Sequence, residues 1–70
     1  MSYIFVNSSD LLAVDYDNIS QVLEVAFRSG GKYEYFDVPQ NIYLGLMNAS
    51  SKGSFLHRYI KNQFQYKRIA

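Results

Sequence analysis

Two tyrosines that alternate along one predicted strand, Tyr33 and Tyr35, are the residues best suited to do chemistry in this chain. Arg28 and Lys32 precede them in the sequence. Aromatic rings on a sheet can stack with nucleic-acid bases while nearby cationic side chains meet the phosphates. The pattern therefore indicates a site for single-stranded RNA or tRNA. Alternating tyrosines are also typical of half-buried core packing, so both interpretations stay open.

A second cationic group lies further along the chain, on a predicted helix that carries Arg58 and Lys61. Lys52, His57, Lys67 and Arg68 add positive or titratable groups nearby. Such a face can neutralise phosphates, and it can equally be an ordinary solvated helix face. We keep Arg58 and Lys61 as candidate RNA-binding residues.

Enzyme and metal chemistry lack the residues they need. His57 is the single histidine, and all six carboxylates lie in the other half of the chain, so no base–nucleophile pair is visible. There is no cysteine, and no spacing typical of zinc or calcium ligands. The stretch from Ser29 to Lys32 lacks the full spacing of a phosphate loop and is interpreted as a turn. We predict a non-catalytic protein with no metal and no cofactor.

The charges are unevenly distributed, although the formal net charge is only +1. Residues 1–37 carry six acids and two bases, whereas residues 38–70 carry five bases and no acid. This asymmetry is compatible with a nucleic-acid or acidic partner, or with attraction between the two halves in the fold. The acidic half would repel phosphate unless the fold turns it away from the ligand.

The length of 70 residues predicts one small domain spanning 1–70. The N-terminus has no basic region and no cleavage-site pattern, and no apolar run is long enough to span a membrane. We therefore expect a cytoplasmic protein that does not engage a membrane.

The hydrophobic pattern predicts an α+β fold, an antiparallel three-stranded β-meander followed by two α-helices packed on one face of the sheet. The expected strands are Leu11–Tyr16, Val22–Arg28 and Lys32–Phe36. One helix is expected to begin at Pro39, and a second is expected to be capped by Ser50 or Ser51. Residues 64–69 are predicted to form a short fourth strand or an extended tail.

Within the predicted helices, apolar residues recur at helical spacing. Ile42, Leu46 and Ala49 form the buried stripe of the first helix, with Tyr43 and Met47 beside it. In the second helix, the stripe is expected to consist of Phe55, Leu56, Tyr59 and Ile60.

The turn between the second and third strands decides which way the tyrosines face. A three-residue loop from Ser29 to Gly31 places Tyr33 opposite Phe27 and Tyr35 opposite Val25, on the core face. A two-residue loop would place both tyrosines on the opposite face. We favour the three-residue loop because it gathers the apolar residues on one face.

An ordered set of short motifs runs through nearly the whole chain. It consists of Val6-Asn7-Ser8-Ser9, Tyr16-Asp17, Leu23-x-Val25-x-Phe27, Gly30, Tyr33-x-Tyr35, Val38-Pro39, Ala49-x-Ser51-x-Gly53, Phe55-Leu56 and Ile60. This set resembles the KTSC domain, a short module named for its occurrence at the C-terminus of some lysyl-tRNA synthetases and also found as a free-standing small bacterial or phage protein.

The resemblance implies that Tyr33 and Tyr35 correspond to the family's central Tyr-x-Tyr motif. The function of the family is unknown, and RNA binding is only suggested. Ser8, Ser9 and Ser51 match family positions, either as structural residues or as a hydrogen-bonding rim around the tyrosines. Family members often have Phe and Asn where this chain has Leu56 and His57, so a role of that Asn cannot be transferred.

Together these observations predict a small binding module with RNA as its partner. The alternative is a protein-interaction or self-assembly module that uses the aromatic face or an edge strand to meet a protein partner or a second copy of itself.

Overall fold

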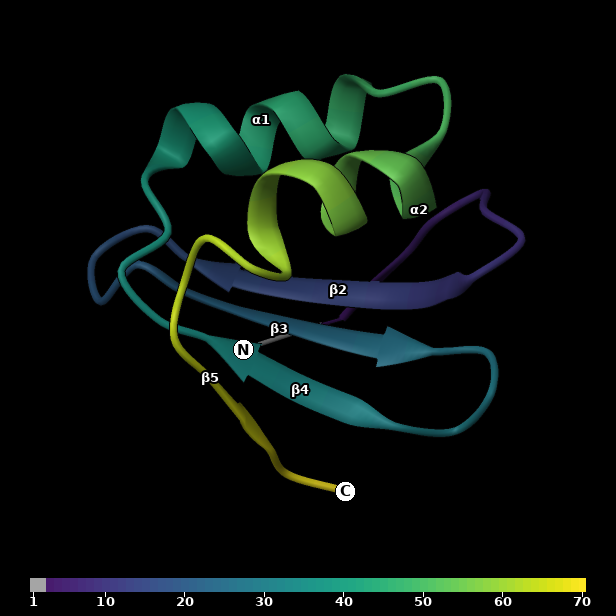
Figure 1. Cartoon of the computed structure of the whole chain (residues 1–70), viewed down its shortest axis with the longest axis horizontal. Helices are drawn as coiled ribbons and strands as arrows, with labels where there is room; N and C mark the ends of the chain where they lie inside the picture. Colours follow the sequence, from purple (N-terminus) through teal and green to yellow (C-terminus); the bar gives the residue numbers. More distant parts are fainter. Residues whose placement is uncertain (1–2) are drawn as a thin grey trace.

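The sheet has five antiparallel strands in sequence order. The computed structural model describes residues 3–70, and the strands labelled in Figure 1 run side by side in one sheet. The strands are β1 (Ile4–Phe5), β2 (Leu11–Asp17), β3 (Val22–Phe27), β4 (Lys32–Tyr35) and β5 (Tyr66–Arg68). The predicted α+β class is confirmed, but the predicted number of strands, three with a short fourth, was too low. It missed β1, which is only two residues long.

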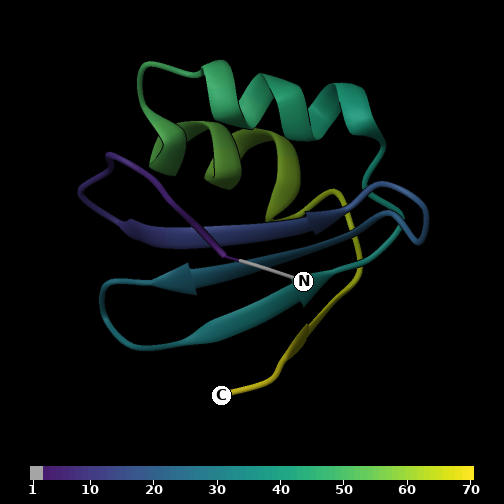
Figure 2. The same cartoon turned by 180° about the vertical axis from the view of Figure 1, so that it is seen from behind.

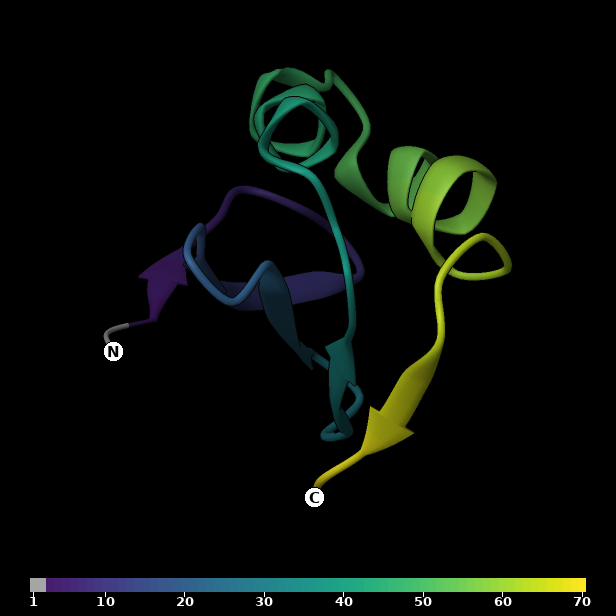
Figure 3. The same ribbon diagram turned by 90° about the vertical axis from the view of Figure 1, so that its left-hand side faces the viewer.

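Two helical segments follow β4. Helix α1 spans Gln40–Asn48, and α2 (Lys52–Phe55) continues directly into a π-helical turn, η1 (Leu56–Ile60). Both segments lie on the same side of the sheet, as Figures 2 and 3 show from two further directions. We call this side the inner face. No helix within residues 3–70 has the length and apolar character to cross a membrane.

The core lies between the inner face and the helices. Its buried residues are Val6, Leu11, Val14, Leu23, Val25, Tyr35, Val38, Leu46, Leu56 and Ile60. The helices lie over β2 and β3, whereas β4 and β5 extend beyond them (Figures 1 and 3). Part of the inner face therefore has no helix above it.

The side chains alternate between the two faces of the sheet, and the apolar residues of β3 that were predicted to face the core lie on the inner face. Leu23 and Val25 face inward and are fully buried. On the outer face, Glu24 pairs with Asp15 on one side and with Glu34 on the other. Lys67 of β5 pairs with Glu34. The fold thus gathers several carboxylates on the outer face, away from the helices.

The hairpin between β3 and β4 has a three-residue loop from Arg28 to Gly30, one residue earlier than predicted. The Phe27 amide donates to the Gly31 carbonyl at 2.8 Å, and Gly30 has φ 113°. A turn followed by a positive-φ glycine is a common three-residue hairpin. Because Gly30 and not Gly31 takes this position, the pairing shifts by two residues.

The shifted register pairs Tyr33 with Val25 and Tyr35 with Leu23. The predicted partners, Phe27 and Val25, were therefore wrong. The predicted face was right, because a shift of two residues leaves each side chain on the same side of the sheet.

The two helices begin and pack as follows. Pro39 precedes α1, and its carbonyl accepts from the amides of Ile42 and Tyr43 at 3.0 and 3.2 Å. The Ser51 hydroxyl accepts from the Ser54 amide at 3.3 Å and so caps α2, as predicted. Leu46 is the buried residue of α1.

The second helix departs from the predicted pattern at Tyr59, which is 46% exposed and not part of the buried stripe. The Lys61 amide donates to the Leu56 carbonyl, five residues back, at 2.8 Å. In such a wide turn each residue advances by a smaller angle than in an α-helix. Leu56 and Ile60 consequently stay buried, while Tyr59 turns away from the core.

Candidate functional site

The two predicted tyrosines lie side by side on the inner face of β4, with different exposure. Tyr35 is 2% exposed and belongs to the core, whereas Tyr33 is half-buried. Their ring centroids are 6.4 Å apart, and the Phe27 ring meets the Tyr33 ring edge-on at 5.7 Å. Burial, followed by the nearby Tyr33 and Tyr66, raises the pKa of Tyr35 to about 12.

Strand β5 adds two further side chains to this cluster. Tyr66 pairs with Tyr35, and Arg68 pairs with Tyr33. The Tyr66 ring lies 5.8 Å from Tyr33 and 5.9 Å from Tyr35, yet it is 58% exposed. The Arg68 guanidinium carbon lies 5.7 Å from the centre of the Tyr33 ring, within cation–π range.

These residues surround a hollow of about 310 Å³. We call it the tyrosine hollow, lined by Phe27, Ser29, Gly31, Tyr33, Tyr35, Lys61, Tyr66 and Arg68. Its walls are aromatic rings, and its cations come from β5 and from the residue after η1. It occupies the part of the inner face that has no helix above it.

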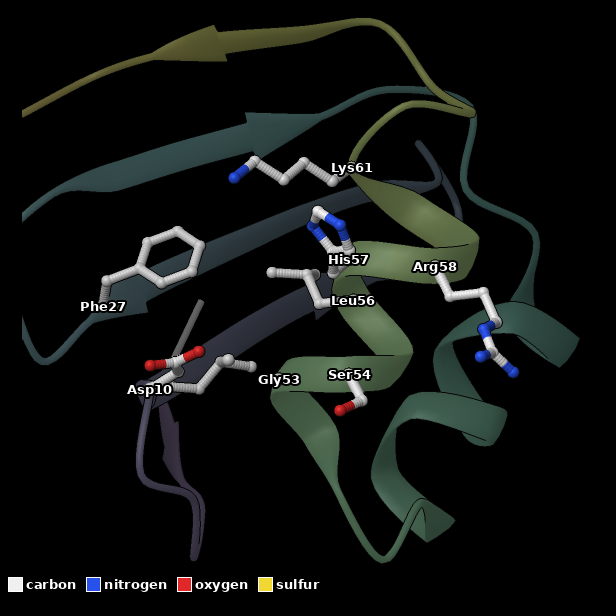
Figure 4. A pocket seen from close by; sticks show the side chains of 9 residues that line it. Asp10, Phe27, Gly53, Ser54, Leu56, His57, Arg58 and Lys61 are labelled. Carbon is white, nitrogen blue, oxygen red and sulfur yellow. The ribbon is translucent and has the colours of Figure 1, made fainter.

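A second hollow of about 380 Å³ adjoins the first, because Phe27 and Lys61 line both. We call it the Asp10 hollow, lined by Asp10, Leu11, Phe27, Gly53, Ser54, Leu56, His57, Arg58 and Lys61. Figure 4 shows Phe27 on one side of it and His57 and Leu56 on the other. Asp10 lies beside Gly53, the Lys61 side chain extends toward Phe27, and Arg58 points away.

Asp10 is placed by the loop between β1 and β2. The Ser8 hydroxyl accepts from the amides of Asp10 and Leu11 at 3.2 and 3.1 Å. The Asp10 carbonyl accepts from the Arg28 amide at 2.9 Å. A Cβ atom on Gly53 would lie only 3.0 Å from Oδ2 of Asp10, so the glycine leaves room for this carboxylate.

Arg28 and Lys32, predicted to accompany the tyrosines, lie elsewhere. The Arg28 side chain donates through Nε to the Ser8 carbonyl at 2.7 Å, which ties the hairpin loop to the β1–β2 loop. Lys32 is on the outer face, where its ammonium nitrogen lies 5.4 Å from the centre of the Tyr3 ring. Neither residue lines the tyrosine hollow.

The three candidate serines also lie apart from the tyrosines. Ser8, Ser9 and Ser51 line a separate polar hollow of about 270 Å³, together with Asn7, Ser50 and Lys52. Ser8 organises the β1–β2 loop, and Ser51 caps α2. These serines therefore do not form the hydrogen-bonding rim around the tyrosines, which was one of the two roles that the resemblance implied for them.

Comparison with known proteins agrees with the motif pattern. The family model described as the KTSC domain matches residues 7–64. The chain belongs to the KTSC domain family.

Several relatives of this KTSC domain are similar over most of the chain. A lysine–tRNA ligase from a Nostoc species is 42% identical over 62 residues, which cover 89% of this chain and 11% of the ligase. An uncharacterised protein from Stutzerimonas stutzeri is 37% identical over 70 residues, 99% of each chain. The crystal structure of a KTSC domain protein from Yersinia pestis has a TM-score of 0.94 at 36% identity, covering 99% of this chain and 97% of that one.

The KTSC domain thus spans only about a tenth of the length of the ligases it matches. Tyr66 and Arg68 lie beyond the residues that match the family model. Family motifs therefore could not point to these two residues. The available signal was the alternation of Tyr66 and Arg68 on a short C-terminal strand.

Around the two hollows the fold brings together Tyr33, Tyr35, Arg58 and Lys61 from the predicted set. It adds Phe27, Tyr66, Arg68 and Asp10. Within residues 3–70 no three His, Cys, Asp or Glu side chains are arranged to hold a metal ion. The predicted lack of a metal, a cofactor or catalysis remains a prediction.

Proposed function

We propose that this KTSC domain is a non-catalytic module that binds single-stranded RNA in the tyrosine hollow. The observation that supports this most directly is the exposed Tyr66 ring beside Tyr33, with Arg68 over Tyr33. A base can stack on an exposed ring, and the neighbouring guanidinium can meet a phosphate. Stacking needs a base with a free face, which single strands offer and duplexes do not, and it tolerates any base.

The distribution of charge supports the same proposal. Lys61 and Arg68 line the hollow on the inner face, whereas Asp15, Glu24 and Glu34 form a row on the outer face. These three of the six carboxylates in the sequence are therefore turned away from the proposed ligand. This arrangement reduces the repulsion of phosphate that the sequence alone suggests.

The relatives suggest which RNA to test first. Three of them are lysine–tRNA ligases, whose name describes proteins that act on tRNA. Exposed single-stranded parts of a tRNA are accordingly the first natural ligands to try. The proposal includes a cytoplasmic location, where such RNA is found.

The test is a titration of the protein into labelled single-stranded RNA and into a tRNA mixture, followed by fluorescence anisotropy at low and near-physiological salt. Binding should weaken as the salt concentration rises. The slope of the logarithm of the binding constant against the logarithm of the salt concentration should reflect the number of phosphates that meet a cation. Tyr66→Ala should weaken binding by roughly 1–3 kcal/mol, the usual contribution of one base stack. Arg68→Ala should weaken binding and flatten the salt dependence.

The chain offers matched controls for both variants. Lys67→Ala removes a cation from the same strand on the outer face, and Tyr59→Ala removes another exposed tyrosine, on η1. Both should bind RNA nearly as the wild type does. Lack of RNA binding at low salt, or equal losses in the control variants, would refute the proposal.

A second candidate is self-association through β1, one of the two edge strands of the sheet. Its side chains Ile4 and Phe5 are 50% and 75% exposed, and Leu12 beside them is 37% exposed. An apolar edge strand can pair with the same strand of a second copy. Analytical ultracentrifugation tests this. A mass that rises with concentration and returns to that of the monomer in Phe5→Lys supports it, and a monomer at all concentrations refutes it.

A further inference from the structure

The Asp10 hollow holds a solvent-exposed carboxylate that has no partner among residues 3–70. Within residues 3–70 the Asp10 carboxylate makes no hydrogen bond or ion pair, and it is the single carboxylate among the described residues that line the two hollows. It would repel a phosphate placed beside it. The same hollow is lined by His57 and Lys61, so the site offers acceptors and cations at separate positions.

The shape of the hollow suits a flat group. Phe27 lies on one side, and Leu56 and His57 lie on the other, with Asp10 at one end (Figure 4). The volume of about 380 Å³ falls within the roughly 300–1,000 Å³ typical of sites for small ligands. An unstacked base can occupy such a slot between an aromatic ring and an imidazole.

A carboxylate accepts hydrogen bonds through both oxygens and donates none. Among the four RNA bases, guanine presents two adjacent donors, N1–H and N2–H, on its Watson–Crick edge. Adenine and cytosine present one amino group beside a ring acceptor, and uracil presents one N–H between two carbonyls. Asp10 therefore complements guanine and meets a repulsive acceptor on each other base.

We propose that the Asp10 hollow binds a guanine base of the RNA strand, with N1–H and N2–H donating to Asp10. This inference rests on the proposed function, since the neighbouring nucleotide stacks in the tyrosine hollow. Lys61 lines both hollows and meets the phosphate that joins the two nucleotides. The module thus reads a single guanine next to a base of any type.

Gly53 is part of this specificity. Because a Cβ at this position would lie 3.0 Å from Oδ2 of Asp10, alanine would push the carboxylate a few tenths of an ångström from its present position. Alanine is a better helix former than glycine, so the helix itself tolerates the change. Gly53→Ala therefore tests the position of the carboxylate without removing its charge.

The experiment compares uridine hexamers that carry guanine, adenine, cytosine or uracil at one central position, by anisotropy with wild type, Asp10→Asn and Gly53→Ala. The guanine hexamer should bind wild type about tenfold more tightly than the others, as expected for a bidentate contact to one base. Asp10→Asn should reduce this preference to about twofold or less, without weakening the binding of the other hexamers. Gly53→Ala should reduce it as well.

The matched control is Glu24→Gln, which removes one carboxylate charge from the outer face and should keep the guanine preference. Binding that is indifferent to the base but still depends on Tyr66 would overturn this inference and leave the proposed function standing. A guanine preference that survives Asp10→Asn would overturn it too. If no hexamer binds, the proposed function and this inference both fall.

Discussion

The inner face of the sheet consists of two halves that differ in their side chains and in their surroundings. In the covered half, formed by β2 and β3, Val14, Leu23 and Val25 are 0% exposed beneath the helices. In the open half, formed by β4 and β5, Tyr66 is 58% exposed and Tyr33 is half-buried. Tyr35, at 2% exposed, marks the boundary.

The difference comes from what lies above each half and from the size of its side chains. Aliphatic residues fill most of the space under α1 and η1, and the one tyrosine that β2 contributes there, Tyr16, stacks on Tyr43 of α1 at 4.3 Å. Rings that end in a hydroxyl can line a surface with one side packed and the other wet. A strand whose sequence is typical of a core strand thus lines an open hollow where the helices do not cover it.

The largest effect on stability is expected from a substitution at Tyr35, the residue at this boundary. Tyr35→Ala removes a buried ring and should lower the free energy of unfolding by about 3–5 kcal/mol. A domain of this size is typically stable by roughly 3–5 kcal/mol, so the variant should be largely unfolded at 25 °C. Urea denaturation followed by circular dichroism measures this. A folded variant with near wild-type stability would show that Tyr35 belongs to the open half.

Alkaline pH should act on the same residue by a somewhat smaller amount. The pKa of Tyr35 is raised from 10.0 to about 12 because burial disfavours the phenolate. Its contribution to stability is therefore complete below pH 10 and is lost as the pH rises toward about 12. The loss amounts to roughly 2–3 kcal/mol.

Urea denaturation at several pH values measures this loss, with Tyr35→Phe as the control. Phenylalanine keeps the ring and cannot ionise, so its stability should fall less steeply above pH 10. Identical pH profiles for the two proteins would contradict the assignment of Tyr35 to the buried side.

A smaller effect on stability is expected from weakening α2, one of the helical segments that cover the sheet. Ser51→Ala removes the hydroxyl that accepts from the Ser54 amide and should cost about 1 kcal/mol of stability. RNA affinity should stay the same, since Ser51 lines a different hollow. Parallel denaturation and anisotropy measurements separate the two outcomes. A loss of affinity in a fully folded variant would restore Ser51 to the binding site.

The smallest effect on stability is expected in the open half. Tyr66→Ala removes an exposed ring and should change the free energy of unfolding by less than about 1 kcal/mol. Urea denaturation gives this value directly. Destabilisation as large as that of Tyr35→Ala would mean that the two halves form one continuous core.

The sequence was sufficient to predict the central hairpin and the side of the sheet on which the tyrosines lie. The larger apolar residues of β3 alternate, which places Leu23 and Val25 on one face together with Phe27. The register could not be predicted, because Gly30 and Gly31 are chemically identical candidates for the positive-φ position. The choice depends on how the whole loop joins both strands.

The candidate site could be predicted only in part, because half of it depends on long-range pairing. Tyr66 and Arg68 join the tyrosines through a strand of three residues, too short to carry a clear pattern. Asp10 meets Gly53 across more than 40 residues of sequence. Arg28 and Lys32 are close to the tyrosines in the sequence and yet lie away from the hollow.

The wide turn of η1 makes the position of Lys61 tolerant of a change in the length of the chain. Lys61 follows a turn that closes over five residues, from the Leu56 carbonyl to the Lys61 amide. Such a turn holds one residue more than an α-helical turn between the same two hydrogen-bonded groups. Deleting one residue within it would let the same amide reach the same carbonyl across four residues, so Lys61 and the strand that follows would keep their places. Related domains can therefore gain or lose a residue in this turn and still present this cation to both hollows.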